Sequence, residues 1–425
     1  MTPLAQQFAD WFATALRGPL AQLRGADPVL GLALVVLAAL VVANALHRHL
    51  KLPRLLGYML VGTIASPALL GLLQSGDLDA WKPLIDLAIA ALVFELGTRL
   101  RPRWLLDNRW LAASCVLEAV AAALAVGIAL VMLGAPAASA VMAAAVAAAT
   151  SPIITMAVVI EARPRGQVAE RLMTMSALNS VLAILAIKLW SVWTGLGAPG
   201  ASDAPAILAN AALVVFGSLL LGLACGWSLD RISRVDGDAT TMPVLQIALV
   251  VLAALLSVAL GLSPLMALLV AGMTARRRMG HRLTVEPYLG SAGAALTVLL
   301  FVSIGLRSSL GDLHALWPWV AAIIAARLLG KGLAVAATAR PSGLGWGQAL
   351  ALSLALQPMS SLSALLAASS FSGTAQMAGV DAAVMQAVLI ATTLMQLTGP
   401  LWVLWPLQHI ARECELPQES RRHGA

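Results

Sequence analysis

This chain carries Ala149-Thr150-Ser151-Pro152 in the middle of the apolar segment 137–160, and Gln357-Pro358-Met359-Ser360-Ser361 in the middle of the apolar segment 348–371. Each interruption combines a proline with small hydroxyl residues. In a bilayer, unwound backbone is tolerated only where it is buried in protein or lines a water-filled path. Two such interrupted segments in corresponding positions of two halves are typical of a carrier's binding site. A proline kink in an ordinary packed helix is the alternative for each one.

The composition places the chain in the membrane class. Hydrophobic residues make up 60% of its 425 residues and charged residues only 11%, a balance that soluble domains of this length do not show. A span needs about 20 apolar residues at a rise of 1.5 Å each. Thirteen candidate spans follow: 29–46, 55–72, 83–100, 110–133, 137–160, 168–194, 205–228, 241–260, 264–275, 288–306, 315–338, 346–371 and 380–407.

The chain divides into three predicted parts. Residues 1–28 carry apolar side chains at helical spacing and are expected to form an amphipathic segment in the membrane interface. Residues 29–407 form the transmembrane domain, and residues 408–425 form a short tail. The three cysteines are isolated, so a disulfide framework and a cysteine metal site are not expected.

Basic residues predict the orientation of the spans. We number the loops between the candidate spans in chain order. Twenty of the 27 Lys and Arg residues then lie in the odd-numbered loops and the C-terminal tail, and four lie in the N-terminus and the even-numbered loops. The positive-inside rule then places the C-terminus in the cytoplasm and the N-terminus outside. Because the basic clusters lie at span ends, the net charge of +7 reflects topology, and nucleic acid is not an expected partner.

The positions of the two breaks predict an internal repeat. They lie in the fifth and twelfth spans, and an odd separation makes the two segments cross the bilayer in opposite directions, as inverted repeats require. Each broken span is preceded and followed by a long one, namely 110–133 and 168–194 for the first, and 315–338 and 380–407 for the second. We expect these six spans to form one core bundle.

Several short motifs resemble the sodium/hydrogen exchanger family, in its bacterial monovalent cation:proton antiporter branch. They are LGYMLVG at 56–62, ALVFELG at 91–97, ATS at 149–151, LGLS at 260–263, LFVSIGL at 300–306 and RLLGK at 327–331. The resemblance covers about residues 29–407. It implies an all-α polytopic membrane protein of about thirteen transmembrane helices, with the inverted-repeat antiporter fold and two crossed discontinuous helices. It also implies a homodimer in the bacterial inner membrane that exchanges Na⁺ or K⁺ for protons by alternating access.

The chain departs from this family at the ion site. Where the family has two adjacent residues that end in aspartate, this sequence has Asn179-Ser180. Within these 425 residues we do not expect the nucleotide-binding regulatory domain of potassium-efflux members. Neutral oxygens at these positions could still contact a cation, but they cannot exchange it for a proton. Either another carboxylate takes over or proton coupling is lost.

Two acidic residues lie well inside predicted spans. Glu118 is either the proton-carrying group or a partner for Arg109, Arg327 or Lys331. Glu95 precedes Arg99 by four residues, which favours an ion pair along one helix.

Two basic residues share one face of the eleventh span. Arg327 and Lys331 either neutralise the negative C-terminal ends of the half-helices, which we favour, or attract an anion to an electropositive site.

The resemblance therefore implies a monovalent cation:proton antiporter, with a non-transporting sensor or assembly protein and an anion or organic-acid carrier as alternatives. No cofactor is expected, and an enzyme is not expected because no nucleophile–base or metal set is visible. The predicted ion path consists of Thr150, Ser151, Pro152, Asn179, Ser180, Gln357, Pro358, Ser360 and Ser361, with the intramembrane charges Glu118, Arg327, Lys331 and Glu95.

Overall fold

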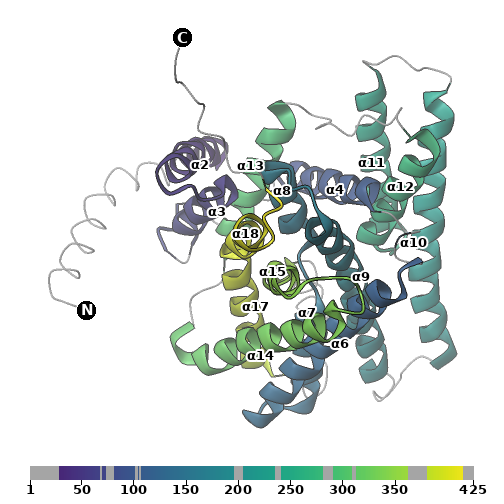
Figure 1. The fold of residues 1–425 in the computed structure, drawn as a ribbon. Coiled ribbons are helices and arrows are strands. Elements are labelled where there is room, and N and C mark those ends of the chain that lie inside the picture. The colour runs from purple at the N-terminus through teal and green to yellow at the C-terminus, as the bar shows by residue number, and fades with distance from the viewer. Residues whose placement is uncertain are drawn as a thin grey trace. The chain divides into compact units, whose positions relative to one another are not determined.

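A computed structural model of the protein describes residues 28–67, 69–72, 81–100, 104, 107–195, 204–234, 241–280, 291–308, 313–361 and 381–414. All regular structure in these ranges is helical (Figure 1). The helices are α2 (Pro28–Leu50), α3 (Arg54–Ala65), α4 (Lys82–Arg99), α6 (Arg109–Met132), α7 (Ala137–Ala148), α8 (Pro152–Ala162), α9 (Gln167–Gly195), α10 (Ala204–Ser233), α11 (Thr241–Ala259), α12 (Pro264–Met279), α13 (Ser291–Leu306), α14 (Leu313–Ala339), α15 (Trp346–Ala355), α17 (Ala382–Leu397) and α18 (Gly399–Trp405), with a π-helical turn at Pro406–Ile410.

The helices follow the predicted spans. Each of the thirteen candidate spans contains a described helix or a pair of helices. Among the described residues, seven helices are long and apolar enough to cross a bilayer, and eight if a bent pair counts as one span. The chain is thus a multi-pass membrane protein. Residues 1–27 and 362–371, which carry the predicted amphipathic segment and the end of the twelfth span, lie outside the described ranges.

The last predicted span, 380–407, is divided into two helices. The span consists of α17 and α18, which meet at an angle of 45°. Pro400 lies in the first turn of α18, and its ring cannot follow a continuous helix because it lacks an N–H and clashes with the preceding turn. The bend therefore has a local cause in the Gly399-Pro400 pair.

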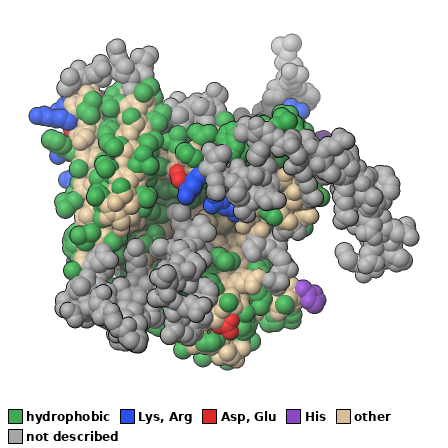
Figure 2. Space-filling view, turned by 180° about the vertical axis from the view of Figure 1, so that it is seen from behind, with side chains coloured by type: hydrophobic (Ala, Val, Ile, Leu, Met, Phe, Trp, Pro, Cys, Tyr) green, Lys and Arg blue, Asp and Glu red, His purple; other side chains and the backbone are tan. Residues whose placement is uncertain are grey.

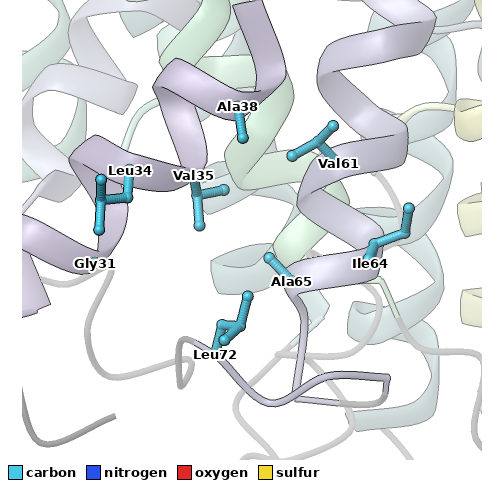
Figure 3. Close-up of a pocket in the computed structure, with 8 residues that line it drawn as sticks. All are labelled: Gly31, Leu34, Val35, Ala38, Val61, Ile64, Ala65 and Leu72. Carbon is cyan, nitrogen blue, oxygen red and sulfur yellow. The ribbon is translucent and has the colours of Figure 1, made fainter. Parts of the chain in front are cut away.

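The chain forms two compact units, of which the first comprises residues 1–86 and 294–309. Its described helices are α2, α3 and the greater part of α13. An apolar cavity of about 280 Å³ lies between α2 and α3 (Figure 3). Its lining contains only apolar side chains and one glycine: Gly31, Leu34, Val35, Ala38, Val61, Ile64, Ala65 and Leu72.

The second unit comprises residues 87–293 and 310–425 and contains the predicted core bundle. Helices α6, α7, α9, α14, α15 and α17 contact one another there, and α10 to α12 belong to the same unit. The α6–α14 pair is especially close. A Cβ atom at Gly330 of α14 would lie 2.7 Å from the carbonyl oxygen of Ala121 on α6, so only glycine fits this crossing.

The outer surface suits contact with lipid. Large apolar side chains are exposed along several helices, for example Phe216 at 64%, Leu255 at 64% and Leu333 at 71%. On the face shown in Figure 2, hydrophobic side chains cover much of the described surface and charged groups are few. Polar side chains that are buried inside the second unit stand out against this background.

Candidate functional site

The first broken segment ends one helix and starts another within three residues. Helix α7 ends at Ala148, and the backbone is extended at Ala149 and at Ser151. Proline disfavours helical backbone in the residue before it, and Pro152 is the first residue of α8. The Ser151 hydroxyl caps α8 by accepting a hydrogen bond from the Ile154 N–H at 3.3 Å. The predicted break is present, and Ser151 and Pro152 are the residues that make it.

The second broken segment follows the same logic. Helix α15 ends at Ala355, and no regular helix follows through residues 357–360. Gln357 precedes Pro358, so the proline again disfavours continuation of the helix. The described chain of this segment stops at Ser361, so only the first half of the predicted segment can be compared.

The two breaks touch each other directly. The Ser151 backbone N–H donates to the Pro358 carbonyl at 2.8 Å, and the Thr150 hydroxyl donates to the Leu356 carbonyl at 3.0 Å. The residues of these contacts are buried, and residues about two hundred positions apart in the sequence are joined here. Each segment therefore supplies a hydrogen-bond partner at the break of the other, which helps to satisfy polar groups in a low-dielectric interior.

Arg327 binds the carbonyl ends of both half-helices. Its guanidinium donates to the Ala147 carbonyl, to the Ala149 carbonyl at 2.8 Å and, on the other segment, to the carbonyls of Leu356 at 3.1 Å and Gln357 at 3.2 Å. The last carbonyls of a helix have no partner within it and carry partial negative charge. Arg327 is fully buried and offsets that charge at two helix ends, in the arrangement that the sequence favoured.

A second buried cation, Lys331, lies one helical turn further along α14. Its ammonium group donates to a carboxylate oxygen of Glu118 on α6, to the Thr150 hydroxyl at 3.1 Å and to the Ala148 carbonyl at 3.3 Å. Glu118 and Lys331 are both 0% exposed. The other carboxylate oxygen of Glu118 accepts a hydrogen bond from the Asn179 amide on α9. Three helices thus meet at one carboxylate.

Asn179 and Ser180 lie beside this carboxylate and the first break. The Ser180 hydroxyl donates to the Thr150 carbonyl at 2.7 Å. Asn179 uses its amide N–H on Glu118, and its Oδ1 atom is buried without a hydrogen-bond partner among the described residues. Gln357 has a similar arrangement, because its amide N–H donates to the Ser353 carbonyl of α15 and its Oε1 atom is buried without a partner among the residues that the structure describes. Such unpaired oxygens are uncommon in a packed interior.

For the remaining predicted site residues, no contact with the Glu118 carboxylate is described. Glu95 forms its ion pair with Arg99 at 2.7 Å along α4, as the four-residue spacing predicts. Ser360 is buried and Ser361 is partly buried at the end of the described segment.

Two features of this unit were not predicted. Glu413 belongs to the predicted tail, yet its carboxylate accepts hydrogen bonds from the Val168 and Ala169 N–H groups, both at 2.8 Å, at the start of α9. Gly166 allows this approach, since a Cβ atom there would overlap Glu413. The second feature is a polar cavity beside Arg171, also near the start of α9. Neither feature can be predicted from a local sequence pattern, because each brings together residues that are far apart in the sequence.

Two discontinuous helices that touch at their breaks, with buried charges around the contact, define the fold of an inverted-repeat secondary transporter. The sequence matches the family described as sodium/hydrogen exchanger, transmembrane, over residues 35–409. Since this match covers most of the chain, the protein belongs to the sodium/hydrogen exchanger family. Members of this family are transporters, and the chain is not an enzyme.

The fold agrees with solved structures of one antiporter. A structure of the sodium proton antiporter MjNhaP1 from Methanocaldococcus jannaschii at pH 8 has a TM-score of 0.68 and 18% identity, covering 90% of this chain and 98% of that one. A second structure of MjNhaP1, from an electron-microscopy map, has a TM-score of 0.70 and 17% identity. The match covers 91% of this chain and 98% of that one. At these identities the likeness concerns the fold alone. No curated protein sequence matches the chain.

Proposed function

We propose that this protein exchanges a monovalent cation for protons, with the Glu118 carboxylate as the group for which they compete. The observation that carries the proposal is the position of Glu118, which is fully buried between α6, α9 and α14 and held by Lys331 and Asn179. An ionisable group inside a membrane domain marks an ion pathway or proton relay by default. Family membership supplies the reaction class.

The contacts support three competing states of this carboxylate. In the structure it binds the Lys331 ammonium group. A proton on the carboxylate would remove that charge attraction, and Lys331 would keep its other acceptors, the Ala148 carbonyl and the Thr150 hydroxyl. A metal cation would take the ammonium's place on the same oxygens. Because only one positive species fits at a time, cation and proton exclude each other, which is the requirement for exchange.

Neutral side-chain oxygens on α9 and at the second break would complete the coordination of a cation. Asn179 Oδ1 and Gln357 Oε1 are buried without partners among the described residues, and both are oxygen ligands of the kind that hard cations prefer. This explains how Asn179-Ser180 could serve where the family's motif, by resemblance, carries an aspartate. The cation is Na⁺ or K⁺ under this proposal, and the crossed breaks would expose the site to each side in turn by alternating access.

The anion-carrier alternative is disfavoured by the way Arg327 is used. Its guanidinium donates to four carbonyls, so little of its hydrogen-bonding capacity remains for an anion. An experiment distinguishes a non-transporting protein from a transporter. Ser180→Asp places a carboxylate next to Asn179, and we expect tighter cation binding and faster cation-driven proton flux if the domain moves. A protein that only senses or assembles would show no flux in either form.

Flux in vesicles tests the proposal. The purified protein is reconstituted, and the internal pH is followed after a pulse of Na⁺ or K⁺, for the unaltered chain, Glu118→Gln and Glu95→Gln. The Glu95 variant is a matched control, because Glu95 is also a buried carboxylate but pairs with Arg99 on its own helix. We expect flux to be lost in Glu118→Gln and kept in Glu95→Gln. Unchanged coupling in Glu118→Gln would remove Glu118 from the mechanism.

We further propose that the protein is a homodimer in the bacterial inner membrane, as the family resemblance implies. Its N-terminus would lie outside and its C-terminus in the cytoplasm, as the distribution of basic residues predicts. Residues 1–28 would lie in the interface and residues 408–425 would form the cytoplasmic tail. Labelling of single cysteines introduced in the odd-numbered and even-numbered loops of intact cells checks the orientation, and cross-linking in the membrane checks the dimer.

A further inference from the structure

A polar cavity of about 360 Å³ lies at one end of the core bundle, apart from the Glu118 cluster. It lies where the start of α6, the start of α9 and the turn after α14 come together. Its lining is Trp104, Asn108, Gln167, Glu170, Arg171, Ser342 and Gly343. The basic residues predict that these three chain segments face the cytoplasm. The volume is within the range of sites that bind small molecules.

Arg171 is the unusual member of this lining. It is only 3% exposed, yet no carboxylate among the described residues forms an ion pair with it. Its guanidinium donates to the Ser342 carbonyl at 2.5 Å and lies over the Trp104 ring at 5.7 Å, while its Nε–H has no hydrogen-bond partner. A buried, uncompensated charge is strongly unfavourable unless something of opposite charge joins it.

The donors around the cavity indicate what could join it. Asn108 uses its side-chain oxygen to cap α6 through the Leu111 N–H at 3.0 Å, so its amide N–H₂ group remains as a donor. Gln167, at the first position of α9, is exposed and adds a second amide. Together with Arg171, these two residues give the cavity lining one guanidinium group and two amides from two helix starts. Arginine with flanking amides is a favourable set for the oxygens of a phosphate or carboxylate.

We propose that this cavity binds an oxyanion of the phosphate type, held by Arg171 and the amides of Asn108 and Gln167. The anion comes from a cytosolic solute or from the headgroup of a lipid. Glu170 also lines the cavity, so a bound group that carries a hydroxyl or a protonated oxygen on that side fits better than a fully ionised one. The proposal does not depend on ion exchange, because binding can be measured without transport.

Occupancy would also connect the cavity to the core bundle. Arg171 and Asn179 are both on α9, eight residues apart, which corresponds to about 12 Å along the helix. Asn108 caps the helix that carries Glu118, and Ser342 follows the helix that carries Lys331. An anion held between these three segments would restrain the ends of the same helices that meet at Glu118.

Binding of radiolabelled inorganic phosphate to the purified protein in detergent tests the proposal by equilibrium dialysis. In parallel, short-chain phosphatidic acid is compared with phosphatidylcholine in thermal unfolding, to detect a lipid source. The key variant is Arg171→Gln. Its matched control is Arg340→Gln, because Arg340 also stacks on a tryptophan, Trp346 at 5.4 Å, but is exposed. Gln167→Trp is a second variant that fills the cavity and leaves Arg171 in place.

We expect saturable binding of phosphate or stabilisation by phosphatidic acid but not by phosphatidylcholine. Either should weaken at least about tenfold in Arg171→Gln, as loss of a charge-assisted contact predicts, and should persist in Arg340→Gln. If Arg171→Gln does not fold, loss of binding in Gln167→Trp carries the test. No saturable binding of either probe, or binding that both cavity variants retain, would overturn the proposal.

Discussion

Breaking the ion pair between Glu118 and Lys331 should destabilise the protein far more than removing both of its members. In Glu118→Gln, the Lys331 ammonium stays buried but keeps the Ala148 carbonyl and the Thr150 hydroxyl as acceptors. We therefore expect the free energy of unfolding to fall by about 3 kcal/mol, the lower end for a broken buried pair. Lys331→Met leaves the carboxylate with the Asn179 amide and should also cost about 3 kcal/mol.

The double variant Glu118→Gln, Lys331→Met carries no uncompensated charge. The carbonyl of the introduced glutamine can still accept from Asn179, and methionine fills the volume of the lysine stem. Replacement of a buried pair by neutral residues is often nearly neutral, so we expect a cost of about 1 kcal/mol. The two substitutions would then be non-additive by about 5 kcal/mol, which exceeds the range of roughly 0.5–3 kcal/mol that is usual for neighbouring residues.

The assay is unfolding of the four purified proteins by a titration with sodium dodecyl sulfate in mixed micelles, followed by tryptophan fluorescence. The pair Glu95→Gln and Arg99→Ala provides a comparison, because Arg99 is only partly buried and its pair should couple weakly. Additive costs at Glu118 and Lys331, giving a double variant about 6 kcal/mol less stable than the unaltered chain, would refute the reasoning that one buried pair holds the site.

Two further predictions concern helix packing and the chain end. Gly330→Ala should separate α14 from α6 and abolish exchange in vesicles, because its Cβ would lie 2.7 Å from the Ala121 carbonyl oxygen. Gly332→Ala is the control and should behave as the unaltered chain, because a Cβ at Gly332 would have no neighbouring atom within 4 Å. Equal activity of the two variants would contradict the packing argument. Burial and the nearby Glu413 raise the pKa of the Cys414 thiol to about 11, so its alkylation at pH 8 should be slow and should rise with pH toward that value. Glu413→Ala removes the carboxylate that caps α9 and should speed alkylation at pH 8 by up to roughly 100-fold in a chain without the other two cysteines, because release of the segment restores an ordinary thiol pKa; an unchanged rate would show that Glu413 does not hold this segment.

Features of the fold that have a local cause were predictable from the sequence. Hydropathy located the helices, and the prolines at 152 and 358 marked both breaks, because proline acts on the residue before it. The bend at Gly399-Pro400 has the same chemistry, but it was missed since the apolar run on either side of it is continuous. Spacing along one helix also predicted the pair of Glu95 with Arg99.

The candidate site was predictable only in part, since it depends on which helices pack together. The sequence identified Glu118 as an intramembrane carboxylate but left Arg109, Arg327 and Lys331 open as its partners, and the α6–α14 crossing selects Lys331. Glu413 contacts the start of α9, and Arg171 lies among residues from other parts of the chain. The sequences around these contacts carry no periodic signal. Such contacts follow from tertiary packing, which a pattern within one helix does not encode.

The most direct test of competition at Glu118 is the release of protons when cation is added. The purified protein is held in detergent in a weakly buffered solution with a pH indicator, and Na⁺ or K⁺ is added as the chloride, with choline chloride as the control. At a pH low enough that Glu118 is protonated before the salt is added, the incoming cation replaces that proton on the carboxylate, so we expect release of roughly one proton per cation bound, and none from Glu118→Gln. Equal proton release from both proteins, or none from the unaltered chain while it binds the cation, would contradict the account.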